Sequence, residues 1–325
     1  MSGVQTKTIA PQDDGIRLDR WFARHYPDLK NGRLQRLLRG KNIRVNGAKA
    51  TAGQRLAAGD AMRIPPLDAP EKENAPRDLS KADAAFMQGL VLYRDNDVIA
   101  LNKPAGIAVQ GGTKTERHID GMLDALRFGA PEKPRLVHRL DKETSGVLLL
   151  ARHAKAAEKL TKAFASRDAR KAYWAVVVGR PKIAQGKIDA PLAKKSAGGR
   201  DSRTIDADTG QRAITLYRVA DSLANRASWL ELFPLTGRTH QLRIHAAQAL
   251  NTPIAGDAKY GGDRAGVLGL PHQMHLHARA IQIPHPSRGV LNVTAPIPPH
   301  MADSFRFLGF EEADVPNPFA LLQED

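Results

Sequence analysis

The chain has 325 residues, and its 49 Lys and Arg exceed its 34 Asp and Glu by a formal net charge of +15. A charge of this size attracts polyanions over long range and favours nucleic acid as a partner, with an anionic membrane as the second candidate. The chain has no cysteine, which excludes disulfides, thiol nucleophiles, iron–sulfur clusters and cysteine-based zinc sites. The hydrophobic share of 42% is too high for a disordered basic chain, and the length allows about two domains.

No stretch of the sequence is typical of a targeting or membrane segment. The first fifteen residues lack the apolar run of a signal peptide, and the longest aliphatic runs, such as residues 147–151, have the length of a strand. We therefore expect a soluble, cytoplasmic protein with no membrane partner.

The first predicted unit is a small basic α+β block over residues 15–64. Apolar periodicity predicts two helices, a strand and a tight turn, at residues 16–22, 32–39, 43–45 and 46–47. Asn31 is placed to cap the second helix and Gly40 to end it. Between residues 15 and 63, twelve Lys and Arg stand against three Asp and Glu, which favours RNA or DNA binding over an ordinary solvated basic face.

This block resembles the S-four-type RNA-binding module. The resemblance rests on Arg17–Trp21 and on Arg36–Gly47, which includes the Asn-Gly turn. The basic residues that we assign to RNA contacts in this block are Arg33, Arg36, Arg39, Lys41 and Arg44.

Residues 65–80 differ in composition from the block before them. Four prolines, and four acidic against two basic residues between 64 and 80, predict an extended linker. The end of the chain is also acidic, with one basic and six acidic residues from 300 to 325. We expect residues 311–325 to form a tail that faces away from any polyanion.

Residues 81–310 are predicted to form one large α+β domain. Its expected strands lie at 90–93, 98–101, 147–151, 172–178, 213–219 and 229–235, and its expected helices at 154–166 and 240–250. Short connections between neighbouring strands predict a mixed, mostly antiparallel sheet flanked by helices and loops. Residues 194–210, rich in Gly, Ser, Asp and basic residues, predict an exposed hairpin loop.

Common nucleotide-binding and hydrolase motifs are missing from the sequence, namely the phosphate-binding loop, the dinucleotide fingerprint, H-E-x-x-H and G-x-S-x-G. His272, His275 and His277 are close in sequence, but no Asp or Glu between residues 263 and 302 could complete a metal site with them. We expect a polar cluster or an RNA-facing edge there, and no metal.

Two dense polar runs remain, at residues 138–146 and 236–245. In the first run, Asp141 precedes the apolar strand 147–151, where a carboxylate is costly to desolvate unless it is paired. The second run offers basic partners. The residues alone leave two readings open, a structural ion pair that holds a loop or a catalytic carboxylate.

Both runs resemble those of the RluA-type ribosomal RNA pseudouridine synthases. Residues 138–146 are similar to the family's H-R-L-D-x-x-T-S-G run, and residues 235–245 to its G-R-T-H-Q-[IL]-R-[IV]-H run. Three shorter matches keep the family's order, at Leu101–Gly106, Lys171–Tyr173 and Gly256–Gly261. Within the family the resemblance is closest to the branch of ribosomal large-subunit pseudouridine synthase C, which also carries an N-terminal RNA-binding module.

The resemblance implies an isomerase that converts uridine to pseudouridine in large-subunit (23S) ribosomal RNA without a cofactor. Asp141 is then the catalytic carboxylate, which attacks C1′ or removes the C2′ proton, and Arg243 is its ion-pair partner. Tyr173 stacks on the uracil ring, and Arg139 enters the RNA stack when the uridine flips out. The residues that position loops or phosphates are Lys103, His138, Lys171, Arg238 and Gln241.

Other functions stay open at this point. A non-catalytic RNA-binding or ribosome-assembly protein on a synthase scaffold is one, although a broken H-R-L-D run would favour it and the run is intact. A nucleoside-cleaving glycosidase is another, because Glu143 lies two residues from Asp141 and such enzymes use two carboxylates. The family leaves the position of Glu143 variable, so we treat it as a surface residue. We expect a monomer.

Overall fold

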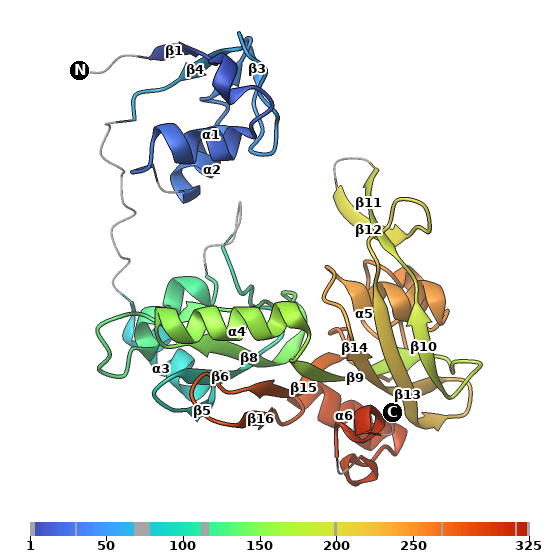
Figure 1. Cartoon of the computed structure of the whole chain (residues 1–325). Helices are drawn as coiled ribbons and strands as arrows, with labels where there is room; N and C mark the ends of the chain where they lie inside the picture. Colours follow the sequence, from blue (N-terminus) through green and yellow to red (C-terminus); the bar gives the residue numbers. More distant parts are fainter. Residues whose placement is uncertain are drawn as a thin grey trace. The chain divides into compact units, whose positions relative to one another are not determined.

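The computed structural model describes residues 4–29, 31–67, 79–111, 117–197, 200–267, 269–315 and 317–323. The chain divides into two compact units, Met1–Arg77 and Asp78–Asp325, which are described separately (Figure 1). Most of the linker expected at residues 65–80 lies outside the described residues. Among those described, no helix combines the length and the apolar character needed to span a membrane.

The N-terminal unit packs a small sheet against two helices, α1 (Leu18–His25) and α2 (Asn31–Arg39). In its described part the sheet has the order β1-β4-β2-β3 and is antiparallel, with strands β1 Gln5–Thr8, β4 Ala61–Ile64, β2 Arg44–Val45 and β3 Ala48–Lys49. The core is apolar, and its fully buried members include Leu18, Phe22, Ile43 and Met62.

The turns of this unit follow from the sequence with one difference. Asn46 and Gly47 both have positive φ, at 50° and 76°, as a tight hairpin turn requires. Helix α2 ends at Arg39 as expected, but the left-handed residue beyond it is Lys41 (φ 59°) rather than Gly40. The side chain of Asn31 lies outside the described residues, so its capping role stays a prediction.

The C-terminal unit is built on one large mixed sheet. Within the described residues it has ten strands in the order β10-β13-β14-β9-β15-β8-β6-β5, with β16 beside β15 and β7 beside β8. All pairs are antiparallel except β15 with β8. The strands are β5 Val91–Arg94, β6 Val98–Lys103, β7 Arg135–Leu136, β8 Ser145–Ala151, β9 Arg170–Val178, β10 Gln185–Asp189, β13 Ile214–Leu223, β14 Ala227–Pro234, β15 Leu276–Pro284 and β16 Val290–Thr294. The expected α+β class with a mostly antiparallel sheet is confirmed.

Helical segments cover both faces of this sheet. Alternate residues of β8 point to opposite sides, so that Leu149 packs with Leu160 of α4 while Leu148 packs with Leu123. Every residue of β8 is buried, which explains its unbroken apolar run. The helical segments are α3 Lys81–Gly89, η2 Asp120–Leu126, α4 Ala154–Ser166, α5 Gln241–Ile244, η3 His245–Ala249, η4 Gly262–Ala265, α6 Pro299–Leu308, η5 Glu312–Asp314 and η6 Ala320–Gln323.

Two segments differ from the sequence expectation. The helix expected at residues 240–250 changes from an α-helix to a π-helix at His245. The π-helix is rare in proteins overall, but where it occurs it is often at a functional site. The segment expected as an acidic tail is packed in its described part, because Phe319 and Leu321 are buried against Phe233 and neighbouring small residues. Two apolar side chains therefore outweigh the acidic composition.

The hairpin expected at residues 194–210 is present as β11 (Leu192–Ala197) and β12 (Arg200–Ile205), which stand out from the body of the unit (Figure 1). Its tip, residues 198–199, lies outside the described residues.

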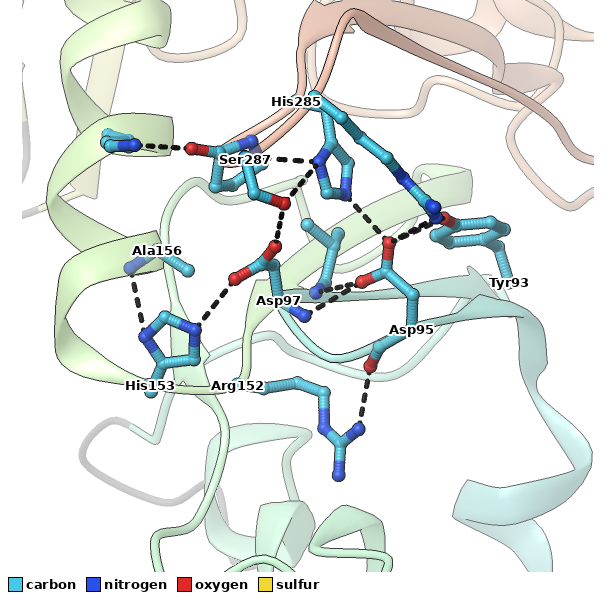
Figure 2. A network of polar contacts seen from close by, with 12 residues as sticks. Tyr93, Asp95, Asp97, Arg152, His153, Ala156, His285 and Ser287 are labelled. Atoms are coloured by element: carbon cyan, nitrogen blue, oxygen red, sulfur yellow. Dashed lines mark hydrogen bonds and ion pairs between the residues drawn. The ribbon is translucent and has the colours of Figure 1, made fainter.

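A network of polar side chains stabilises the C-terminal unit where β6 begins. Figure 2 shows Asp95 and Asp97, from the turn between β5 and β6, bonded to side chains of two other elements. Asp97 accepts from His153 at 2.8 Å and from Ser287, and Asp95 contacts His285 at 2.8 Å. Burial raises the pKa of Asp95, but hydrogen bonds from Tyr93 and from backbone amides outweigh burial and hold this pKa at about 2. The network joins this turn to the start of α4 and to the connection between β15 and β16.

Candidate active site

A pocket of 680 Å³ in the C-terminal unit brings the two polar runs together. The loop before β8 contributes Asp141, the segment after β14 leads to Arg243 on α5, and β9 contributes Tyr173. Leu322, from the packed C-terminal segment, also lines the pocket. A pocket of this volume is of the size that holds a small ligand or one nucleotide.

Asp141 faces two side chains of the second run. Its Oδ2 lies 3.7 Å from Nη1 of Arg243 and 3.8 Å from Nε2 of His240, and the Asp141 side chain is 20% exposed. The structure therefore brings together the predicted pair Asp141 and Arg243, at ion-pair distance and without a direct hydrogen bond. Glu143, as expected, is exposed at the surface.

Asp257 is the stronger partner of Arg243, and sequence reasoning assigned it no role. Arg243 donates to the two oxygens of Asp257 at 2.8 Å and 2.6 Å, and both side chains are buried. Although burial opposes it, these bonds raise the pKa of Arg243. A buried guanidinium needs such a carboxylate, and the Gly256–Gly261 match was the signal that could have located it.

Gly256 allows this arrangement. It has a left-handed φ of 77°, and a Cβ at this position would lie 2.1 Å from the carbonyl oxygen of Gln273. Only glycine fits the turn that presents Asp257 to Arg243.

Tyr173 lines the pocket from β9. Burial and the charge of Asp141 raise the pKa of its hydroxyl, so the phenol keeps its proton at neutral pH. A neutral ring beside a carboxylate is suited to stacking on a flat base.

Lys103 is at the end of β6 and fully buried, so of the two roles expected for it, positioning loops or phosphates, its surroundings fit the first. Its Nζ donates to the carbonyl oxygens of Pro104, Ile107 and Lys142 at 2.8, 2.9 and 3.0 Å. Burial lowers its pKa to about 8, against the opposing charges of Glu143 and Asp141. Lys103 therefore holds the Asp141 loop from inside.

Gln241 is likewise turned inward. Its amide oxygen accepts from Thr236 and from the backbone of Arg238, while its amide nitrogen donates to Ile214 and Thr215. With its side chain buried and its hydrogen bonds made inside the protein, Gln241 shapes the segment after β14 rather than meeting phosphate.

His138 and Lys171 line the pocket beside Asp141. Nε2 of His138 accepts from the backbone amide of Leu149 at 2.8 Å, its ring stacks on Phe164, and burial lowers its pKa to about 3. Burial also lowers the pKa of Lys171 to about 8. His138 is thus a neutral anchor of the Asp141 loop on β8.

The remaining basic residues are more accessible. Arg139 is exposed and Arg238 half-buried, and both line the pocket. In the N-terminal unit Arg33 is half-buried on α2. The exposed members of the predicted RNA-contact set there are Arg36, Arg39, Lys41 and Arg44.

Two of the three histidines considered for a metal site lie inside the protein, while His272 is exposed. His275 and His277 are fully buried and bond to Ser304 and Ser145. Within the described ranges, the one group of three acidic or histidine side chains close enough to share a metal ion is Asp95, Asp97 and His285. These three belong to the network of Figure 2, at the opposite end of β6 from Lys103, and bond to protein groups.

Comparison with known proteins decides the family. A family model described as RNA pseudouridylate synthase matches residues 97–248, which include Asp141, Tyr173 and Arg243. Ribosomal large subunit pseudouridine synthase C of Rickettsia conorii is 40% identical over 271 residues, covering 82% of this chain and 88% of that protein. The chain belongs to the RNA pseudouridylate synthase family.

A further relative and a solved structure agree with this assignment. RNA pseudouridine synthase 4, mitochondrial, of Arabidopsis thaliana is 34% identical and covers 89% of this chain and 78% of its own. The solved structure of human RNA Pseudouridylate Synthase Domain Containing 4 is 29% identical, with a TM-score of 0.59 over 70% of this chain and 96% of that one. The resemblance drawn from the two polar runs is confirmed, while the S-four-type identity of the N-terminal unit stays a prediction.

Proposed function

We propose that this chain isomerises uridine to pseudouridine in large-subunit ribosomal RNA, with Asp141 as the catalytic carboxylate. Family membership gives the reaction class, and the name of the relative from Rickettsia conorii supports the large subunit as the substrate. The observation that carries the assignment is the position of Asp141, in a pocket with Arg243 on one side and the ring of Tyr173 in its wall.

The reaction breaks the bond between N1 and C1′, turns the uracil and joins C5 to C1′, so atoms and oxidation state are conserved. No group donor is needed, and the proposed enzyme works without cofactor or metal. The contacts of Asp141 with Arg243 and His240 both reach Oδ2, and we propose that Oδ1 faces the ribose. From there it either attacks C1′ or takes the C2′ proton.

The uridine must leave its helix to reach this pocket. Flipping a base costs a few kcal/mol, and in this proposal Arg139, which is exposed and lines the pocket, fills the gap in the stack. Tyr173 then stacks on the extruded uracil, and its protonated hydroxyl can exchange a proton at C5.

Folded RNA would be held outside the pocket by charge and shape. The surfaces proposed for this are the basic residues of the N-terminal unit and of the β11–β12 hairpin, where Lys194 and Lys195 are exposed. We place the enzyme in the cytoplasm as a monomer, and its cysteine-free chain suits a reducing compartment.

Tritium release from ribosomal RNA labelled at uridine C5 tests the proposal. The wild-type protein should release tritium while the RNA keeps its mass. Asp141→Asn should reduce release to background and leave RNA affinity within about twofold, because the change removes one charge and keeps the shape. Glu143→Gln, a matched neutralisation at the surface, should keep full turnover.

The other outcomes identify the alternatives. Free uracil would indicate a glycosidase. RNA binding without tritium release would indicate a non-catalytic binding protein, and turnover by Asp141→Asn would remove Asp141 from the mechanism.

A further inference from the structure

His240 and Tyr260 lie beside Asp141, and the roles given above use neither of them. Nε2 of His240 is 3.8 Å from Oδ2 of Asp141, and Nδ1 of the same ring is 2.6 Å from the hydroxyl of Tyr260. The three side chains therefore form a row in which the imidazole stands between a phenol and the carboxylate.

The contacts of His240 determine which of its nitrogens carries the proton. Nε2 faces the Asp141 carboxylate, which can only accept a hydrogen bond, and the Tyr260 hydroxyl at 2.6 Å can donate to Nδ1. An imidazole that accepts at Nδ1 carries its hydrogen at Nε2, which faces Asp141.

His240 is held neutral in this place. Burial lowers its pKa, the charges of Arg243 and Lys259 act in the same direction, and the charges of Asp141 and Asp257 oppose them. A neutral ring gives Asp141 a directed N–H donor without a second cation beside Arg243.

The backbone of His240 is constrained to aim the ring. Its φ of 57° and ψ of 20° are left-handed, a conformation that residues other than glycine rarely adopt and keep only where the surroundings enforce it. The ring meets Tyr260 edge to face, with centroids 5.5 Å apart. Such outliers cluster at functional sites.

The basic hairpin is tied to the helical segment that follows His240. Thr204 and Ile205 of β12 donate to the side-chain oxygen of Gln248 on the π-helix at 3.1 and 3.0 Å. The hairpin is therefore connected to the segment that begins beside His240.

We propose that His240 and Tyr260 are positioning residues for the isomerisation: His240 donates from Nε2 to Oδ2 of Asp141 in the RNA complex, and Tyr260 acts through His240. The bond closes from 3.8 Å when substrate enters, as contacts in free enzymes often do. It fixes Oδ2 and turns Oδ1 toward the ribose. This inference rests on the proposed function.

Single-turnover tritium release at saturating RNA tests the pair. Tyr260→Phe keeps the ring and should lower the rate about tenfold, and His240→Leu by at least as much, with RNA affinity within about twofold. His240→Gln can place an amide N–H near the Nε2 position and should restore the rate to within about threefold of wild type. Because Tyr260 acts through His240, a double variant that combines Tyr260→Phe with His240→Leu should react no more slowly than His240→Leu alone.

Tyr217→Phe is the matched control. The Tyr217 hydroxyl donates to the carbonyl of Ile183, and neither residue lines the pocket. Tyr217→Phe should therefore lose one hydrogen bond, as Tyr260→Phe does, and keep the wild-type rate. Wild-type rates in Tyr260→Phe, or multiplied losses in the double variant, would overturn the pairing. An inactive wild type would instead reject the proposed function. If Tyr260→Phe fails to fold, equal rates for His240→Gln and His240→Leu would overturn the inference.

Discussion

At the scale of single residues, the site depends on how Arg243 divides its nitrogens. Nε and Nη2 bond to Asp257, and Nη1 is the nitrogen that faces Asp141. The guanidinium is planar and rigid, so fixing one edge fixes the other. Asp257 therefore fixes the position of the Arg243 guanidinium, which Asp141 can approach but cannot pull away from Asp257.

Asp257→Asn should weaken both the fold and the reaction. The variant keeps the shape of the side chain and leaves a buried guanidinium without its bidentate partner, which costs about 3 kcal/mol of unfolding free energy. Urea unfolding should show this loss, and tritium release should show a lower rate at saturating RNA.

Asp189→Asn is the control for this change. Asp189 meets Arg212 at 3.4 Å, and both side chains are well exposed, so its removal should cost no more than about 0.5 kcal/mol. Equal stability of the two variants would show that the buried pair does not hold the site.

Sequence reasoning located the proposed reacting residues better than the residues that support them. Asp141, Tyr173 and Arg243 stand in distinctive runs and lie in one pocket. The sequence does not give the direction of a side chain, so it could not show whether Lys103 positions a loop from inside the protein or a phosphate from its surface, and Lys103 is buried. The role of Asp257 depends on a contact across fourteen positions that no local pattern encodes.

At the scale of elements, β15 is the centre of the sheet. It pairs with β9 on one side and β8 on the other, and it carries the buried His277, which bonds to Ser145 of β8 at 2.9 Å. An ionisable group in such a strand links the stability of the sheet to pH.

His277 should make the fold sensitive to mild acid. Burial lowers its pKa to about 4, from an ordinary value of 6.5. Below pH 6.5 the unfolded chain takes up a proton that the folded chain does not, so the unfolding free energy falls as pH drops from 6.5 to 4. At pH 5 the loss from this one residue is about 2 kcal/mol, and above pH 7 it vanishes. Urea unfolding at pH 7.5 and 5 measures the difference.

His277→Gln should remove the part of this dependence that comes from residue 277, because glutamine cannot be protonated, while the buried His138 and His275 keep their own parts. His272→Gln changes an exposed histidine a few residues away and should keep the wild-type dependence. The linkage is wrong if both variants lose as much stability on acidification as the wild type.

The elements that the sequence predicted well have a strong local apolar pattern, an unbroken run in β8 and helical spacing in α4. The π-helix at His245–Ala249 could not be foreseen, because it shares the apolar spacing of the helix that it continues. The packing of the C-terminal segment could not be predicted, because its acidic composition indicated an exposed tail. Its two anchors, Phe319 and Leu321, matter only because the sheet offers them a surface.

At the scale of the whole molecule, charge is distributed unevenly along the chain. Residues 15–63 carry an excess of nine positive charges, and residues 300–325 an excess of five negative ones. The reaction itself needs a single flipped nucleotide, while affinity for folded RNA grows with the number of phosphates contacted. A basic unit outside the catalytic fold can raise affinity without altering the pocket.

Neutralising Arg39 and Lys41 together tests that division. Both are exposed at the end of α2, and replacing them with Gln should lower the slope of log affinity against log salt by about 1.5, because two RNA phosphates are then no longer neutralised. Turnover at saturating RNA should stay unchanged. Lys155 and Lys162, exposed on α4, are the matched pair, because their replacement by Gln removes the same charge from a surface to which we assign no RNA. A similar fall in both slopes would mean that overall charge, and not the N-terminal unit, attracts the RNA.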